Sequence, residues 1–259
     1  MYIKKSLYSF FFASVFLLCG FYTLAFADNN NLKNDGTNKE FSDCLIIKNC
    51  QGAKGIRTNK KVVALTFDDG PHQKYTPEVL AVLKQNNIKA TFFVVGKNAQ
   101  RYPDIIKAVY VDGHVIANHS YSHFFLTKLS DDDVEIELTK ASKIVNGIIG
   151  KYPMLFRPPY GACSDRTTKI ATELGFTTVL WNDMTNDYEV SKTTSEKIAD
   201  DIIRHVRRGS IIGLHDGGGN REKTVKALSL IVSELKDRGY EFLTIPELLN
   251  IDGYRVKTG

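Results

Sequence analysis

Short apolar runs alternate with longer amphipathic stretches from about residue 60 to residue 250 of this 259-residue chain. Runs of three to six residues that are apolar almost throughout are typical of strands buried on both faces, as in parallel sheets. The pattern predicts seven strands: Val62–Phe67, Ala90–Val95, Val115–Asn118, Met154–Phe156, Phe176–Trp181, Ser210–Leu214 and Glu241–Thr244.

The stretches between these strands have apolar residues at helical intervals. Pro77 stands in a first turn, where a helix tolerates proline, and Asp131 and Asp132 favour the positive end of a helix dipole. The predicted helices are Thr76–Asn87, Ala99–Val111, Asp131–Ile149, Arg166–Leu174, Ser195–Val206 and Glu222–Arg238.

Strands that alternate with helices run parallel, because the crossover helices cover the faces of the sheet. Both a barrel and an open doubly wound sheet satisfy this alternation. Polar motifs follow four different strand ends, and a barrel brings such loops together at one rim. We therefore predict an α/β fold, a (β/α) barrel of about seven parallel strands, after a short N-terminal tether.

The chain divides into four parts by composition. Residues 1–27 have two lysines, an apolar stretch and the small-x-small cleavage site Ala25-Phe26-Ala27, the layout of a signal peptide. An uncleaved anchor is the alternative, since about 20 apolar residues span a bilayer. Residues 28–58 are too polar to offset chain entropy by burial, which predicts a flexible tether. Residues 59–250 form one domain, and residues 251–259 a tail.

Three cysteines remain once the leader is removed. Cys44 and Cys50 flank a short apolar segment, and we predict a disulfide between them in an oxidising compartment. Cys163 is then unpaired. No Cys-x-x-Cys spacing occurs, so metal ligation by thiolates is not expected.

The formal net charge of +5 falls to +3 without the two lysines of the leader. This mild excess does not indicate a nucleic-acid-binding protein, which carries a concentrated basic face. We expect an exported protein, periplasmic or extracellular, that is a monomer without a nucleic-acid partner or a stable membrane span.

Four segments place chemistry just beyond strand ends: Thr66–Pro71, His119–His123, Arg157–Gly161 and Leu214–Asp216. Two histidines and an aspartate can hold a divalent metal with open coordination positions. His119 and His123 share one face if they lie on a helix or a helical turn.

Asp68 and Asp69 also fit an ordinary turn, but two acids directly after a buried strand are costly to desolvate unless they are paired or metal-bound. One carboxylate can hold the metal while the other deprotonates water. Arg157 is expected to hold a carboxylate ionised through a forked hydrogen bond, and the Tyr160 N–H to face a developing oxyanion. His215 is the candidate general acid, with Asp187 as the carboxylate that keeps it protonated.

Taken in order, these motifs resemble the polysaccharide deacetylase family, the NodB-homology or carbohydrate esterase family 4 enzymes. The resemblance runs from about Lys60 to Leu249 and includes the closing segments His215–Arg221 and Gly239–Phe242. It implies a distorted (β/α) barrel, often with seven strands.

The resemblance also implies roles for individual residues. Asp69, His119 and His123 match the metal ligands, for zinc first and for cobalt, nickel or manganese as alternatives. Asp68 matches the base, Arg157 the residue that positions it, and His215 the acid. Oxyanion and substrate binding fall to Tyr160, Trp181 and Leu214.

One motif departs from the family pattern, which is typically Asp-x-x-Asp-Trp. Here Asp187-Tyr188 fits the end of the motif, but Met184 occupies the earlier acidic position and Asp183 is one residue away. Either Asp187 or Asp183 could therefore tune His215.

The resemblance implies removal of N-acetyl groups from amino sugars of an acetylated polysaccharide or oligosaccharide, such as peptidoglycan, chitin-like polymers or an exopolysaccharide. Hydrolysis of O-acetyl esters on a xylan-like polymer is an alternative, because the same water attack serves esters. A third is a non-catalytic carbohydrate-binding protein with this fold.

Overall fold

A computed structural model describes residues 44–46, 50, 52–189 and 191–255 of the chain. The predicted signal peptide and most of the predicted tether lie outside these residues. Among the described residues, none of the helices has the length and apolar character needed to cross a bilayer.

The seven predicted strands are all present, and they pair in parallel. They are β3 (Val62–Asp68), β4 (Thr91–Val94), β5 (Val115–Asn118), β7 (Leu155–Phe156), β8 (Thr177–Thr178), β10 (Ser210–His215) and β11 (Glu241–Leu243). Their sheet order is β10-β3-β4-β5-β7-β8, and β11 pairs with β3. The predicted α/β barrel is confirmed.

Two further strands bring the ends of the sheet together. Asp183–Met184 (β9) runs parallel to β10, and Ala53–Ile56 (β2) pairs antiparallel with β10. Ala53 also bridges to Val179, just after β8, so the sheet nearly closes into a barrel. β2 falls inside the predicted tether, which is wrong for residues 53–56: they are held by backbone pairing and by Ile56, which packs against the barrel core. The short strand β1 (Cys44–Ile46) pairs with β2.

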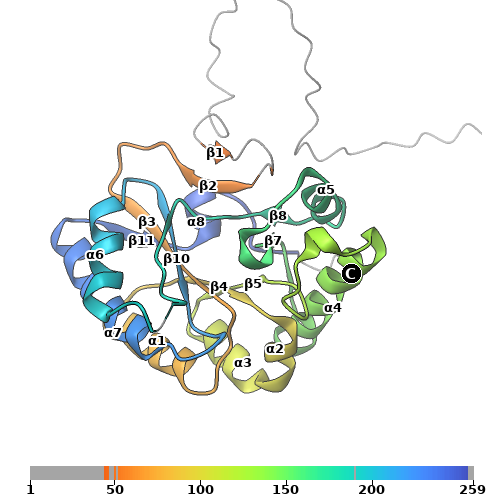
Figure 1. Cartoon of the computed structure of the whole chain (residues 1–259), viewed down its shortest axis with the longest axis horizontal. Coiled ribbons are helices and arrows are strands. Elements are labelled where there is room, and N and C mark those ends of the chain that lie inside the picture. Colours follow the sequence, from red (N-terminus) through yellow and green to blue (C-terminus); the bar gives the residue numbers. More distant parts are fainter. Residues whose placement is uncertain (1–43, 47–49, 51, 190, 256–259) are drawn as a thin grey trace, which may run out of the picture. The chain divides into compact units, whose positions relative to one another are not determined.

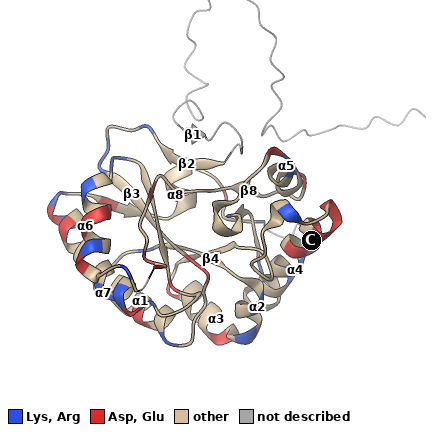
Figure 2. Cartoon of the chain, viewed as in Figure 1, with Lys and Arg blue, Asp and Glu red and all other residues tan. Residues whose placement is uncertain are grey.

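Helices cover the outside of the strands, as Figure 1 shows for α6, α7, α1, α3, α2 and α4. Their bounds are α1 Tyr75–Gln85, α2 Gly96–Arg101, α3 Pro103–Val111, α4 Asp131–Ile149, α5 Asp165–Glu173, α6 Ser195–His205, α7 Glu222–Asp237 and α8 Ile245–Leu249, with 3-10 turns η1 Leu126–Lys128 and η2 Pro159–Gly161. Charged residues of both signs are distributed along these outer helices (Figure 2).

The predicted helix Ala99–Val111 is in fact two helices, α2 and α3. Pro103 begins α3, and Tyr102 before it has a non-helical backbone, with φ −128° and ψ 59°. A residue that precedes proline is disfavoured in the helical region, so the helix breaks there.

Part of the predicted C-terminal tail, residues 251–259, forms a strand. Tyr254–Arg255 (β12) pairs antiparallel with Tyr152–Pro153 (β6). The Tyr254 hydroxyl also accepts a hydrogen bond from the Ile116 N–H at 2.8 Å, which fixes this segment against β5.

Side chains along β3 alternate between two cores. Val63, Leu65 and Phe67 of β3 join the large core beneath the helices, whereas Val62 and Ala64 join a smaller core with Phe93, Ile211 and other interior residues. By the same alternation Thr66 and Asp68 point to the interior, where the strand ends at the rim. Polar groups therefore reach the barrel mouth without disturbing the outer core.

The predicted Cys44–Cys50 disulfide is wrong, because Cys50 is bonded to Cys163, with the Cα atoms 5.5 Å apart. Cys50 lies just before β2, and a Cβ at Gly52 would contact Thr178 and Leu180 beside β8. The Thr168 hydroxyl of α5 donates a 3.0 Å hydrogen bond to the Cys50 carbonyl, so the segment that follows Arg157–Gly161 lies against Cys50. The side chain of Cys44 is not among those described.

Cys163→Ser is expected to lower the free energy of unfolding by about 2–5 kcal/mol, since the bond closes a loop across 113 positions of sequence. Urea unfolding of the oxidised protein measures the change. Cys44→Ser is the matched control and should leave the midpoint unchanged. If Cys44→Ser destabilises the protein and Cys163→Ser does not, the Cys50–Cys163 assignment is refuted.

Candidate active site

The register of neighbouring strands gathers the four polar motifs at one end of the barrel. His215 is paired directly with Asp68 between β10 and β3. Asn118 is paired with Phe156 between β5 and β7, so His119 and Arg157 leave the sheet side by side. Parallel strands present their carboxyl ends at the same edge, which explains how residues far apart in sequence form one site.

Asp69, His119 and His123 form a triad whose candidate ligand atoms all lie within 4.8 Å of one another. The Oδ1 atom of Asp69 is 2.9 Å from Nε2 of His123 and 3.5 Å from Nε2 of His119. This buried oxygen has no hydrogen bond of proper geometry from any described residue. Two imidazole nitrogens around an unsatisfied carboxylate oxygen fit a divalent cation.

Electrostatics at Asp69 agree with this assignment. Burial by itself would raise the pKa of the carboxyl, but the contacts with His119 and His123 hold it well below its usual range. The carboxylate is therefore ionised and ready to bind a cation. Gly218 has a φ of 71°, and a Cβ there would collide with the Asp69 carboxylate, so the loop after β10 needs glycine at this point.

His119 and His123 come together through a loop rather than the predicted helical turn. Ser120 and His123 have left-handed φ values of 61° and 62°, and the Ser120 hydroxyl accepts a 3.0 Å hydrogen bond from the His123 N–H. Glu137 of α4 accepts hydrogen bonds from the N–H of Ser122 at 2.8 Å and of Tyr121 at 3.0 Å. The sequence analysis missed Glu137, since nothing near the motif points to a helix 14 residues away.

The orientation of His119 is set by its second ring nitrogen. Nδ1 lies 2.7 Å from the carbonyl oxygen of Arg157 and donates to it, which leaves Nε2 free on the side of Asp69. Histidine ligands of metals commonly have such a partner, because it fixes both the tautomer and the ring plane.

Asp68 is held by a fully buried arginine. Nη1 of Arg157 donates to Asp68 Oδ1 at 2.7 Å and to the Thr66 hydroxyl at 2.8 Å. The remaining guanidinium nitrogens donate to the carbonyls of Val179 and Leu180. The predicted forked contact is not formed. A single guanidinium nitrogen binds the carboxylate, because the other two nitrogens donate to backbone carbonyls of the barrel interior.

His215 lies against Asp187, not Asp183. Its Nδ1 is 2.7 Å from Asp187 Oδ1, and the Thr224 hydroxyl donates to the other carboxylate oxygen at 3.0 Å. Burial by itself lowers the pKa of His215, but Asp187 and more distant carboxylates raise it to about 9. Asp183 instead accepts a 2.6 Å hydrogen bond from the Ser210 hydroxyl.

These groups line a cleft of about 660 Å³. Tyr160, Trp181, Met184 and Tyr188 form its walls. The Tyr160 ring stacks on Phe125 with 3.9 Å between centroids, and both rings are exposed, Tyr160 by 57%. Trp181 packs over the guanidinium of Arg157. The cleft thus combines polar and charged side chains with the apolar faces of aromatic rings.

Leu214, assigned to substrate binding, does not reach the cleft. It is fully buried in the core beneath the helices, with Ile212 of the same strand. The alternation along β10 turns Leu214 away from the barrel interior and His215 toward it. Tyr160 and Trp181 do line the cleft, as do Asp68, Asp69, His119, His123 and His215.

Comparison with known proteins agrees with the motifs. The polysaccharide deacetylase family model matches residues 55–179. A peptidoglycan-N-acetylglucosamine deacetylase of Bacillus cereus is 40% identical over 194 residues, covering 75% of this chain and 91% of that protein. A chitooligosaccharide deacetylase of Azorhizobium caulinodans is 34% identical, covering 75% of this chain and 97% of the other.

Solved structures share the fold. The crystal structure of a peptidoglycan N-acetylglucosamine deacetylase superposes with a TM-score of 0.75 at 38% identity, covering 78% of this chain and 94% of the other. A family 4 carbohydrate esterase pseudoenzyme of Bacillus anthracis gives 0.71 at 28% identity, covering 79% and 70%. This chain belongs to the polysaccharide deacetylase family, whose domain is the NodB-homology domain of carbohydrate esterase family 4.

Proposed function

We propose that the protein is a metal-dependent hydrolase that removes N-acetyl groups from amino-sugar residues of a polysaccharide or oligosaccharide and releases acetate. The observation that carries this proposal is one cleft containing the Asp69–His119–His123 triad, a buried Asp68 and a His215 paired to a carboxylate. The relatives described above are deacetylases of peptidoglycan and chitooligosaccharides.

Asp69, His119 and His123 would hold the divalent cation. When bound, such an ion supplies a Lewis acid that polarises an acyl oxygen and makes a neighbouring water easier to deprotonate. A site of two imidazoles and one carboxylate suits zinc, and cobalt, nickel or manganese are alternatives.

The remaining residues move protons and stabilise charge. Asp68, positioned by Arg157, takes a proton from the water whose oxygen bonds to the acetyl carbon. The Tyr160 N–H donates to the resulting oxyanion. His215, protonated through Asp187, gives its proton to the nitrogen as the carbon–nitrogen bond breaks, leaving acetate and a free amine.

Acetate release from matched substrates tests the proposal. We expect release from chitooligosaccharides or peptidoglycan glycans, loss after metal removal, and recovery on adding zinc. Exclusive release from O-acetylated xylan would instead establish an esterase. A lack of release from every substrate, with glycan binding retained, would establish a non-catalytic protein like the pseudoenzyme of similar fold.

The aromatic stack at the rim makes a separate prediction. Because sugar rings pack their apolar faces on exposed aromatic rings, Phe125→Ala should raise KM for a glycan about two- to tenfold with little change in kcat. Phe124 is the matched control: it is 61% exposed, and its ring makes no stacking contact within the described part of the chain. Equal changes in both variants would contradict a specific role for the stack.

Export completes the proposal. The Cys50–Cys163 bond suits an oxidising compartment, and residues 1–27 have the composition of a signal peptide. We place the protein in the periplasm or outside the cell, as a monomer. N-terminal sequencing of protein recovered after export should begin at Asp28.

A further inference from the structure

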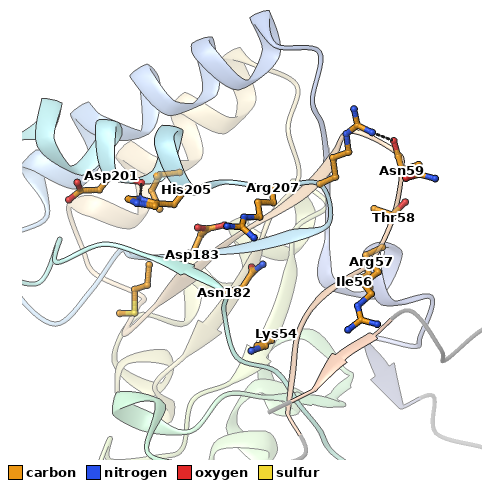
Figure 3. A pocket seen from close by; sticks show the side chains of 13 residues that line it. Lys54, Ile56, Arg57, Thr58, Asn59, Asn182, Asp183, Asp201, His205 and Arg207 are labelled. Carbon is orange, nitrogen blue, oxygen red and sulfur yellow. Dashed lines mark hydrogen bonds between the residues drawn. The ribbon is translucent and has the colours of Figure 1, made fainter. Parts of the chain in front are cut away.

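A second cavity, of about 1060 Å³, lies beside β9 and β2 and is lined by basic side chains. Lys54 and Arg57 come from β2 and the residue after it, and Arg207 and Arg208 come from the turn between α6 and β10. Figure 3 shows Lys54, Arg57 and Arg207 disposed around this space. Two chain segments about 150 residues apart in sequence therefore place four basic side chains around one cavity.

Within the described part of the protein, Arg207 interacts electrostatically with Asp183 of the same cavity, whereas no acidic partner is found for Lys54, Arg57 or Arg208. None of the four is in an ion pair with a described acidic residue, and Arg208 donates only to the carbonyl of Asn59, at 3.0 Å. Lys54 is half-buried, yet neither it nor Arg57 makes a side-chain hydrogen bond with a described residue. A partly desolvated ammonium without a partner favours an incoming anion.

Acidic and titratable groups of the same cavity do not cancel this charge. Asp183 is buried and occupied by the Ser210 hydroxyl, and Asp201 lies on α6. The His205 ring uses Nδ1 to donate to the Asp201 carbonyl at 2.7 Å. Even with both carboxylates ionised, four cations face two anions, which leaves a positive excess.

The basic cavity adjoins the catalytic cleft. Asn182 and Asp183 line the basic cavity, Trp181 and Thr185 line the cleft, and Met184 borders both. A chain-like ligand held in the cleft can therefore continue across Met184 into the cavity. A carbohydrate polymer has this shape.

We propose that the cavity is an anion subsite for an oxyanion substituent on the same glycan whose acetyl group is removed in the cleft. This inference rests on the proposed function for the identity of the glycan. Guanidinium and ammonium groups bind carboxylates and phosphates alike. The carboxylates of peptidoglycan lactyl and peptide groups are the substituents that we assign, since a neutral chitooligosaccharide offers none.

Met184, which borders both the cleft and the cavity, is uncharged, so it does not repel an anionic substituent that passes between them.

Equilibrium binding tests the subsite independently of catalysis. The metal-loaded full chain carrying Asp68→Asn is titrated with a peptidoglycan-derived tetrasaccharide peptide and with the same compound after its carboxylates are converted to methylamides. We expect the carboxylated ligand to bind about tenfold more tightly, and the gap to close at high ionic strength. Equal affinities would overturn the proposal.

Charge-removing variants locate the effect. Lys54→Gln combined with Arg57→Gln should abolish the affinity gap, whereas Lys84→Gln combined with Lys143→Gln removes the same charge from exposed positions on α1 and α4 and should preserve it. A gap that survives the first pair would overturn the proposal, as would a gap lost equally in both pairs.

Two further measurements are needed. The first distinguishes a carboxylate ligand from a phosphate ligand, and the second distinguishes failure of the anion subsite from failure of the proposed deacetylase function. The first measures binding of an oligomeric glycerol phosphate. If this compound binds in a way that depends on Lys54 and Arg57, and the carboxylated glycan does not, the carboxylate assignment is overturned in favour of phosphate. If the parent protein releases no acetate from any glycan but keeps the charge-dependent affinity gap, the proposed function fails and the anion subsite stands.

Discussion

Asp68→Asn is expected to lower kcat for acetate release by roughly a hundredfold or more, with metal affinity unchanged. The amide has the shape of the carboxylate but cannot accept a proton from water at neutral pH. Its oxygen can still receive the 2.7 Å hydrogen bond from Arg157, so the buried guanidinium keeps a partner and the fold is preserved. Steady-state kinetics and a zinc titration measure the two quantities.

Asp69→Asn, one residue further on, is the control for this prediction. We expect weaker zinc binding, by about ten- to a hundredfold, and activity that partly recovers when zinc is added in excess. The contrast is specific because both acids are adjacent and both lie at the same strand end. If Asp68→Asn loses metal and Asp69→Asn keeps it, the assigned roles are reversed.

The division of labour between these acids follows from the end of β3. Asp68 is the last strand residue, and its side chain faces the interior, where it accepts a hydrogen bond from Arg157. Asp69 has a left-handed φ of 72°, which turns its carboxylate out of the strand and toward His119 and His123. One change of backbone conformation therefore gives two identical side chains different chemistry.

The fold was predictable from sequence because parallel barrel strands are buried on both faces. Val62–Phe67 and Ser210–Leu214 are nearly continuous apolar runs, and the structure places strands at both. The site was predictable for a related reason: a polar group directly after such a run can only lie at the rim. His215 and Asp68 both stand at that point, and their strands are paired in register.

What the sequence did not reveal depends on contacts between distant segments. β2 (Ala53–Ile56) has only four residues, including a lysine and a glycine, so it produces no run of apolar residues. The Cys50–Cys163 bond spans 113 positions, whereas Cys44 is only six residues from Cys50, so proximity in sequence favoured the wrong pair. Glu137 holds the histidine loop from a helix that sequence alone cannot place.

Leu214 is a residue whose role cannot be inferred from a family resemblance without its position in the strand. The resemblance assigned it to substrate binding, but it is buried in the core. In a strand, neighbouring side chains point to opposite faces, so the residue next to a catalytic group is the one most firmly excluded from the site. Asp187 illustrates the converse: it is 28 residues from His215 and contacts it directly.

Asp187→Asn is expected to move the alkaline limb of the pH–rate profile from near 9 to lower pH. His215 must be protonated to release the amine, so activity falls as pH rises through its pKa. In the parent, Asp187 raises that pKa against the opposing effect of burial. The amide removes this charge, so burial lowers the pKa against the weaker effect of the more distant Asp68 and Asp69. At pH 8 the rate should therefore drop roughly a hundredfold, whereas at acidic pH the loss should be smaller.

The profile distinguishes this electrostatic role from simple misfolding. Thr224→Val removes the hydroxyl that donates to Asp187 Oδ2 but keeps the carboxylate, so its alkaline limb should remain near that of the parent. All proteins are compared at the same zinc loading, because a nearby cation lowers the pKa of an imidazolium. A uniform loss of rate at every pH in Asp187→Asn would show that Asp187 orients His215 without controlling its protonation, and would assign the alkaline limb to another group.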